Sequence, residues 1–252
     1  MDGIPLVWIL AEAVGESRPG GVYRGILIAA TVLSLWTWSR IARRDSRLLY
    51  IWLSALIGAF VGAKFVYWLA EGWREPVPVD LVARWGAGKS VLGALLGGYG
   101  GVEVAKKALG YRGATGDWFA VMVPFGIAWG RVGCWFNGCC LGQPMEHWHW
   151  WTLADAGGVP RWPAVPLELA FNLVAGVVLV VLRRRRVYPG NLFHLYLMAY
   201  GVFRVAHEFV RNTPRVIGPF SGYAIAALVL IALGVIRFRQ RMAISTGQTM
   251  VL

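Results

Sequence analysis

The sequence predicts an all-α polytopic membrane protein with seven transmembrane helices. The chain of 252 residues is 57% hydrophobic, with a mean hydropathy of +0.54, which is unlike an ordinary soluble domain. Its apolar residues gather into segments of about twenty, the length that crosses the ~30 Å hydrocarbon core of a bilayer. Its 14 tryptophans suit two aromatic belts at the membrane interfaces.

Seven apolar segments follow one another along the chain. They cover residues 21–39, 49–70, 90–108, 116–136, 164–182, 191–210 and 218–236. We therefore expect an N-terminal extracytoplasmic segment over residues 1–20, a membrane domain over residues 21–238 and a polar cytoplasmic tail over residues 239–252.

The loops between these segments carry unequal positive charge. Fourteen of the 25 Lys and Arg residues fall in loops on one side of the predicted membrane, and eight fall on the other. The positive-inside rule then places the N-terminus outside and the C-terminus in the cytoplasm, which agrees with an odd number of spans. Topology and anionic lipid explain the formal charge of +12, so no nucleic-acid partner is expected.

One stretch is unusual for a membrane span: GIAWGRVGCWFNGCCLG, residues 126–142. It places Arg131 inside an apolar segment, where a cation costs roughly 2.5–3.5 kcal/mol or more. Asn137 follows, and the glycines around both residues let a backbone or a lipid headgroup approach closely. We therefore expect a functional site to be built around Arg131 and Asn137.

All three cysteines of the chain, Cys134, Cys139 and Cys140, lie in the same stretch. With His147 and His149 they offer zinc-type ligands, but their spacing matches no zinc-binding pattern. Small cysteines in a glycine-rich turn also pack as apolar residues, and no base stands beside them in the sequence. We therefore expect no metal and no cofactor.

Segment six carries a stripe of ionisable residues. Arg204, His207, Glu208 and Arg211 follow the spacing 0, 3, 4, 7, which places them on one helical face. Such a stripe should face the interior of the bundle, with Glu208 as the partner of Arg204. A structural ion pair and a lipid-headgroup site both remain open for this stripe.

Further polar residues stand in other segments. Glu168 and Asn172 are four residues apart in segment five, and Lys64 lies in segment two, where snorkelling toward the interface is the alternative to a site. The glycine run LGALLGGYGG, residues 92–101, favours close helix packing. The stretch ARWGAGKS, residues 83–90, fits a relaxed P-loop but precedes a membrane helix, so nucleotide binding is not expected.

These residues carry a resemblance to a known family. GRVGCWFNGCCLG, residues 130–142, resembles the signature of the prolipoprotein diacylglyceryl transferases. Four further stretches are similar to family motifs and come in the family's order: GAKFVY (62–67), SVLGALLGG (90–98), RWPAVPLE (161–168) and YGVFRVAHE (200–208). The resemblance covers about residues 20 to 238, and the family's seven-span topology agrees with the charge pattern.

The resemblance implies an activity in the bacterial cytoplasmic (inner) membrane. The family transfers the diacylglyceryl group of phosphatidylglycerol to the thiol of the lipobox cysteine in a prolipoprotein signal peptide. It implies that Arg131 and Arg204 bind the lipid phosphate and that Glu208 orients Arg204. It also assigns substrate binding to the following residues: Asn137, Gly138, Lys64, Glu168 and Gly93.

The chain departs from the family pattern in its proton-handling residues. Leu92 stands where the third-helix motif usually carries a histidine or tyrosine, and Trp162 stands at the histidine of the R-H-P motif. We expect His207, one turn from Arg204, to act as a base instead. Two alternatives stay open: a divergent paralogue with another acceptor, and a non-catalytic lipid-binding protein.

Overall fold

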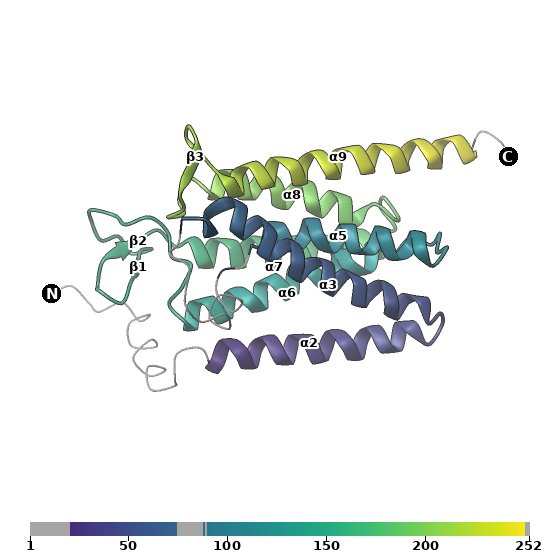
Figure 1. The fold of residues 1–252 in the computed structure, drawn as a ribbon, viewed down its shortest axis with the longest axis horizontal. Helices are drawn as coiled ribbons and strands as arrows, with labels where there is room; N and C mark the ends of the chain where they lie inside the picture. Colours follow the sequence, from purple (N-terminus) through teal and green to yellow (C-terminus); the bar gives the residue numbers. More distant parts are fainter. Residues whose placement is uncertain (1–20, 75–87, 89, 250–252) are drawn as a thin grey trace.

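The computed structural model describes residues 21–74, 88 and 90–249. Long helices run side by side along one axis of the molecule (Figure 1). They are α2 (Gly21–Ala42), α3 (Arg47–Tyr67), α5 (Val91–Ala108), α6 (Gly116–Phe136), α7 (Ala164–Arg184), α8 (Leu192–His207) and α9 (Gly222–Thr249). A π-helical turn, η1 (Trp68–Gly72), continues α3.

The described residues also contain short strands, so the all-α expectation is corrected. β1 (Leu153–Ala154) pairs antiparallel with β2 (Pro160–Arg161), and β3 (Arg215–Ile217) pairs antiparallel with β4 (Phe220–Ser221). All four lie at the left end of the bundle in Figure 1, which we name the strand end. The opposite end, where α7 ends in Arg183 and Arg184, we name the basic end.

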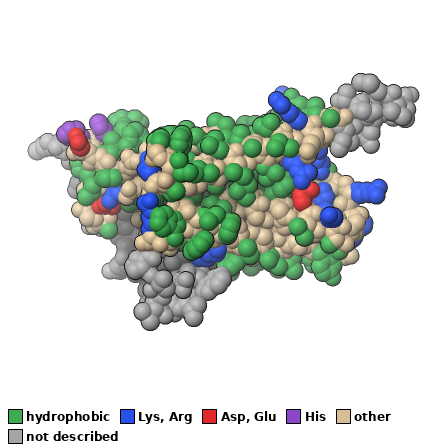
Figure 2. Space-filling model, turned by 45° about the horizontal axis from the view of Figure 1, so that its top comes forward, with side chains coloured by type: hydrophobic (Ala, Val, Ile, Leu, Met, Phe, Trp, Pro, Cys, Tyr) green, Lys and Arg blue, Asp and Glu red, His purple; other side chains and the backbone are tan. Residues whose placement is uncertain are grey.

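Four helical stretches are long and apolar enough to cross a membrane, counted over the part of the chain that is described. They are Arg47–Gly72, Gly116–Phe136, Ala164–Arg184 and Gly222–Ala243. Hydrophobic side chains cover much of the face shown in Figure 2, between the two ends of the molecule. This confirms a mostly helical membrane protein, whereas the count of seven spans, the orientation of the termini and the domain limits stay predictions.

Two helix boundaries differ from those expected. The segment expected to reach residue 210 ends as a helix at His207, so Arg211 lies beyond α8. The last helix starts at Gly222, after the β3–β4 turn at Gly218 (φ +54°), and continues to Thr249. Residues 239–249, expected as a polar tail, are therefore helical. The stretch at 83–90 lies mostly outside the described residues.

Glycines bring α3 and α5 into close contact. A Cβ at Gly58 or Gly62 would overlap the backbone carbonyl of Gly97 or Gly93 on the facing helix. Ser90 caps α5 by accepting a hydrogen bond from the Gly93 amide at 3.2 Å. The glycine run of segment three therefore packs two helices at backbone distance, as expected of small residues in membrane interfaces.

Helix α8 lies at the centre of the core. Its residues Tyr196, Leu197 and Tyr200 are at most 1% exposed and pack with Leu230 of α9. Helix α3 differs, because Phe60, Val61 and Phe65 are each at least half exposed. An exposed apolar face of that kind is what a lipid-facing helix presents. The polar residues of α8, by contrast, lie on a helix that the rest of the bundle shields.

Candidate active site at the strand end

Three helices converge at the strand end and bring distant polar residues together. Helix α6 approaches this end with Arg131 in its last turns, α7 starts there with Glu168 in its second turn, and α8 ends there after Arg204. We call the resulting group the Glu168 cluster. Its members are Arg131, Glu168, Tyr200, Arg204, Glu208 and Arg211.

Glu168 is the centre of this cluster. Its Oε1 accepts hydrogen bonds from Arg131 Nη2 at 2.9 Å and from the Tyr200 hydroxyl at 2.6 Å. Its Oε2 accepts a hydrogen bond from Arg204 Nη1 at 3.1 Å, and Arg211 Nη1 lies 3.9 Å away. Glu168 is only 1% exposed, so one buried carboxylate joins arginines that come from separate parts of the chain.

Arg204 also bonds to a second carboxylate. Its Nη2 donates to Glu208 Oε2 at 2.8 Å, and the Thr213 hydroxyl donates to Glu208 Oε1 at 2.6 Å. The expected pairing of Arg204 with Glu208 is therefore confirmed. The planar guanidinium reaches one glutamate through Nη1 and the other through Nη2, which fixes its orientation more tightly than a lysine could.

The cluster keeps positive charge in excess. Three arginines and two glutamates leave a net charge of +1. Arg204 Nε and Arg211 Nε are buried and have no hydrogen-bond partner among the described residues. A buried N–H without a partner costs roughly 1–3 kcal/mol, and more when the group is charged. The arrangement thus offers donors and net positive charge to an anion.

His207 is held by both of its ring nitrogens. Nε2 lies 2.8 Å from the carbonyl oxygen of Ala164, and because a carbonyl only accepts, Nε2 carries the proton. Nδ1 then accepts from Arg204 Nη1 at 3.4 Å, and the ring stacks on Phe203. The expected role of His207 as a base stays a prediction, but this geometry favours a positioning role for the residue.

The expected headgroup-binding residues lie in the last turns of α6 and just after the helix ends. Arg131 Nη1 donates to Cys134 Sγ at 3.7 Å, one turn further along the helix. Asn137 caps α6 and is exposed, and Gly138 follows in the left-handed region at φ +61°. A Cβ at Gly130 or Gly138 would meet no atom within 4 Å, so these glycines border open space. Their roles in substrate binding stay predictions.

Gly142, the last residue of the signature, ties the stretch to α8 and α7. Its amide donates to the Trp162 carbonyl at 3.2 Å, and it forms an isolated β-bridge with Arg211. A Cβ at Gly142 would lie 2.8 Å from the Val210 carbonyl, so only glycine fits there. The signature therefore closes over the strand end of α8, which explains how Arg211 reaches the cluster.

Other expected site residues lie in helix contacts. Gly93 packs against the Gly62 carbonyl, which is a structural role, and its part in substrate binding stays a prediction. Lys64 donates to the Gly88 carbonyl at 3.0 Å. Leu92 is 1% exposed within the apolar core, so the position that carries a polar residue in the family motif adds no proton donor or acceptor here.

One cluster member, Tyr200, and a residue linked to the cluster, Tyr196, were missed among the expected site residues. Tyr200 stands four residues before Arg204, and Tyr196 four before that, so helical spacing puts both on the charged face of α8. The Tyr196 hydroxyl donates to Asn172 Oδ1 at 2.7 Å, and Asn172 Nδ2 donates to the Glu168 carbonyl at 2.8 Å. The tyrosine spacing was the signal that would have identified them.

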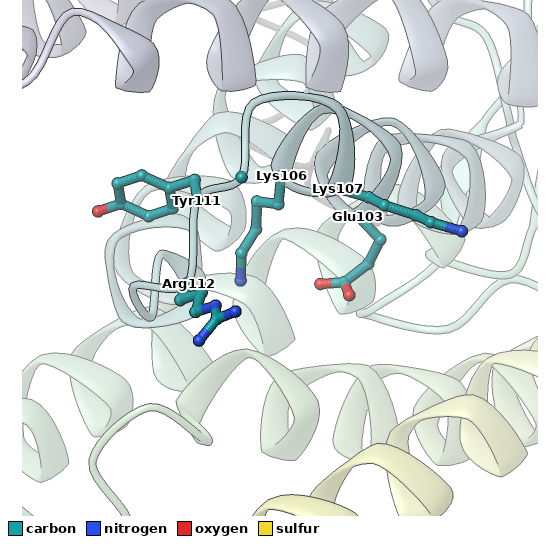
Figure 3. Close-up of a pocket in the computed structure, with 6 residues that line it drawn as sticks. Glu103, Lys106, Lys107, Tyr111 and Arg112 are labelled. Carbon is teal, nitrogen blue, oxygen red and sulfur yellow. The ribbon is translucent and has the colours of Figure 1, made fainter.

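A cavity also opens at the basic end, away from the Glu168 cluster (Figure 3). It measures about 490 Å³ and is lined by the end of α5 and the loop that follows: Glu103, Lys106, Lys107, Gly110, Tyr111 and Arg112. This hollow is therefore a second candidate site. The buried ion pairs at the strand end are the stronger indication, because ionisable groups held in a shielded site are typical of function.

The chain is similar to known proteins over most of its length. The model of the prolipoprotein diacylglyceryl transferase family matches residues 21–239. The chain is 30% identical to the phosphatidylglycerol–prolipoprotein diacylglyceryl transferase of Nitratidesulfovibrio vulgaris (strain DP4), over 76% of this chain and 72% of that protein. It is 26% and 28% identical to the proteins of the same name from Proteus mirabilis and Symbiobacterium thermophilum. Each of these matches covers 85% of this chain and 85% of the relative.

Proposed function

The chain belongs to the prolipoprotein diacylglyceryl transferase family and is a membrane transferase of lipoprotein biosynthesis, and on that premise we propose its reaction. The substrates are phosphatidylglycerol and a prolipoprotein signal peptide with a lipobox cysteine. The cysteine thiol displaces glycerol phosphate from the diacylglyceryl group, and a thioether is formed. The protein acts in the bacterial inner membrane with the Glu168 cluster toward the outer face.

One observation supports this proposal most directly: a single buried carboxylate orients two arginines from different helices. Arg131 and Arg204 contact opposite oxygens of Glu168, at 2.9 and 3.1 Å. A structural ion pair would need only one arginine for that charge. The excess of one positive charge matches the single negative charge of a phosphodiester, and arginine binds phosphate oxygens in bidentate fashion.

The same groups are suited to the displacement step. When the C–O bond of the diacylglyceryl group breaks, the leaving phosphate gains a second negative charge. Guanidinium groups held in a low-dielectric site stabilise that developing charge without reorganising. Arg131 and Arg204 are the proposed donors, Glu168 and Glu208 keep them in position, and His207 holds Arg204 and the start of α7.

A direct assay tests the reaction. Purified full-length protein is mixed with phosphatidylglycerol and a lipobox peptide, and the thioether product is sought by mass spectrometry. A matched peptide with serine in place of the cysteine serves as the control for the acceptor. Product from the cysteine peptide alone supports the proposal. No product from a folded sample, with product from a relative assayed in parallel, contradicts it.

The arginine assignment has its own test. Arg131→Ala should reduce transfer by at least roughly 100-fold, the size of effect seen when one donor to a developing charge is removed. Arg74→Ala is the matched control, because Arg74 is an exposed arginine outside the cluster. Retained activity in Arg131→Ala would contradict the phosphate-binding role.

A second candidate keeps the lipid site and changes the acceptor. Leu92 in the apolar core and Trp162 in the loop before α7 both replace polar residues of the family motifs. The acceptor would then be another nucleophile that needs no base at the Leu92 position. Adding peptides with amine and hydroxyl acceptors to the assay distinguishes the two candidates. The first predicts the thioether as the only product, and the second predicts a product on another acceptor.

A further inference from the structure

The three cysteines gather into one group at the end of α6. Cys134 lies in the last turn of the helix, and Cys139 and Cys140 follow in the turn beyond it. Their Sγ atoms all lie within 4.8 Å of one another, and no His, Asp or Glu side chain of the described residues joins the group. The spacing of the cysteines along the sequence does not reveal this group, because the backbone folds back after Gly138.

The backbone is held in an unusual conformation to achieve this grouping. Cys140 has φ +64°, a left-handed conformation that is uncommon for a residue with a side chain. The Cys139 amide donates to the Cys134 carbonyl at 3.2 Å, and the Cys139 thiol points at the same carbonyl at 3.7 Å. A turn that served only to pack small residues would have no need to collect three sulfur atoms in this way.

We propose that Cys134, Cys139 and Cys140 form a three-thiolate site for a thiophilic divalent metal ion of the zinc class. Three thiolates around a tetrahedral zinc ion, at Zn–S distances of ~2.3 Å, stand about 3.8 Å apart. Small side-chain rotations bring the observed sulfur atoms to that spacing. Thiolate ligands select zinc over magnesium or calcium, which bind oxygen.

The surroundings of the sulfur atoms suit the charge of such a site. One divalent ion with three thiolates carries a net charge of –1, and the Arg131 guanidinium lies 3.7 Å from Cys134 Sγ. Arg131 therefore bonds to Glu168 through one Nη and to the metal site through the other. Cys134 is buried and Cys140 is exposed, so the site opens on the Cys140 side.

Three protein ligands leave the fourth tetrahedral position free, as in catalytic zinc sites. Resting on the proposed transferase function, the ligand for that position is the thiol of the lipobox cysteine. The thiol binds as a thiolate and its proton passes to water, because coordination deprotonates a thiol. Coordination thus removes the thiol proton, a step for which the apolar Leu92 and the engaged nitrogens of His207 offer no base.

The reaction then balances without another reagent. The metal-bound thiolate sulfur forms a bond to the terminal carbon of the diacylglyceryl group. The C–O bond to the phosphate breaks, and glycerol phosphate leaves with the electron pair, toward Arg131 and Arg204. The product thioether is neutral and binds the metal weakly, so it dissociates.

Metal binding is tested on the full-length protein in detergent. Protein purified with reductant is stripped with a chelator and reloaded with Zn²⁺ or Co²⁺. We expect about one ion per chain by elemental analysis and the absorption of a tetrahedral cobalt–thiolate site. Cys139→Ser and Cys140→Ser should each weaken binding at least about tenfold. The double change His147→Ala with His149→Ala is the matched control and should keep the metal.

Three results would overturn the metal site. The first is a reduced, folded protein that binds no metal. The second is unchanged affinity in both cysteine variants. The third is a disulfide between two of the three cysteines in protein whose free thiols were alkylated inside intact cells, since the described thiols would then form a bond instead of a ligand set.

The role of the fourth position is tested with the cobalt form. A lipobox peptide should change the cobalt spectrum, and its serine analogue should not. Metal-free protein should lose most transfer at neutral pH and regain part of it near pH 8.5, the pKa of a free thiol. Thioether formation at full rate without metal would overturn this role and leave the proposed function intact. No thioether from any metal form would count against the proposed function itself.

Discussion

Arginines gather at both ends of the helix bundle, but the two ends treat them differently. At the basic end, Arg184, Arg185 and Arg186 are exposed, and Arg183 stacks over the Trp118 ring at 3.9 Å. At the strand end, the side chains of Arg131 and Arg204 are only 8% and 4% exposed and bond to buried glutamates. The same residue type is thus exposed at one end and is buried in a network of ion pairs at the other.

This difference teaches how to separate topology from chemistry in a basic membrane protein. Exposed charges at the basic end interact weakly with each other and are screened by salt. They still influence the direction in which the chain inserts into the membrane. Buried charges at the strand end interact strongly and require partners. Counting arginines cannot distinguish the two ends, whereas the presence of an acid on a neighbouring helix can.

The largest effect should come from removing the central carboxylate. Glu168→Ala leaves Arg131 and Arg204 without their shared partner in a buried site, which should lower the free energy of unfolding by about 3–5 kcal/mol. Unfolding in detergent, followed by tryptophan fluorescence, measures this. The matched change at the other end, Glu103→Ala, removes a half-buried acid and should cost less than about 1 kcal/mol. Equal losses in the two variants would show that the ends do not differ as described.

The next effect concerns the fork geometry of Arg204. Arg204→Lys keeps the charge but replaces two N–H groups, which reach Glu168 and Glu208 separately, with one ammonium group. We expect the rate of lipid transfer to fall at least roughly tenfold while the protein stays folded. Arg185→Lys at the basic end should leave the rate unchanged. A silent Arg204→Lys variant would mean that charge alone is needed at the strand end.

A third experiment addresses what the exposed arginines do. Replacing residues 183–186 with glutamine removes an unbroken block of four arginines. We expect a measurable share of chains to insert in the reverse orientation, since positive charge close to a span sets its direction. Protease accessibility of a C-terminal tag in sealed vesicles measures that share. Lysine replacements at the four positions keep the charge and should restore the orientation, and a tag outside the cytoplasm in the unchanged chain would refute the predicted topology.

The smallest effect should appear in the loop between α6 and α7. Asp155 accepts hydrogen bonds from the Val159 and Gly157 amides and from Arg161, each at 2.8–2.9 Å. The Val159 amide and then the Arg161 guanidinium lower the pKa of the Asp155 carboxyl. Because the folded loop favours the charged form, the stabilisation is present above the ordinary aspartate pKa of about 3.9 and is lost as the pH falls through the lower folded value.

Hydrogen exchange of residues 143–163 tests this dependence. Protection of the loop should fall between neutral pH and about pH 3 in the unchanged chain. Asp155→Asn should show weaker protection that no longer depends on pH in this range. Identical protection profiles for the two proteins would exclude Asp155 as the group that holds the loop.

Much of the helical framework could be predicted from the sequence because hydropathy and length are local properties. The segments at 116–136 and 164–182 coincide with α6 and α7 to within two residues. The Arg204–Glu208 pair was also predictable, since residues four apart on a helix face each other. The limits of α8 were harder, because Glu208 and Arg211 continue the charged spacing past the helix end.

The connections between helices could not be predicted in the same way. Glu168 meets Arg131 and Arg204 only if α6, α7 and α8 are rotated to face one another, and no spacing within one segment reports that rotation. The cysteine group depends on a left-handed residue at Cys140, which sequence propensity disfavours. The role of His207 as a base stays a prediction, and no sequence pattern could show that its two nitrogens contact Ala164 on α7 and Arg204.

The shared carboxylate also has a consequence for how the protein is made. Arg131 precedes Glu168 by 37 residues, so α6 is synthesised before its partner exists. At about 5–20 residues per second, that interval lasts roughly 2–7 s. During this time Arg131 has no Glu168 to pair with, and an unpaired cation in hydrocarbon costs roughly 2.5–3.5 kcal/mol or more. We therefore expect α6 to be stable in lipid only once α7 has brought Glu168 beside Arg131, so the residue that orders the finished site also bears on when α6 can enter the bilayer.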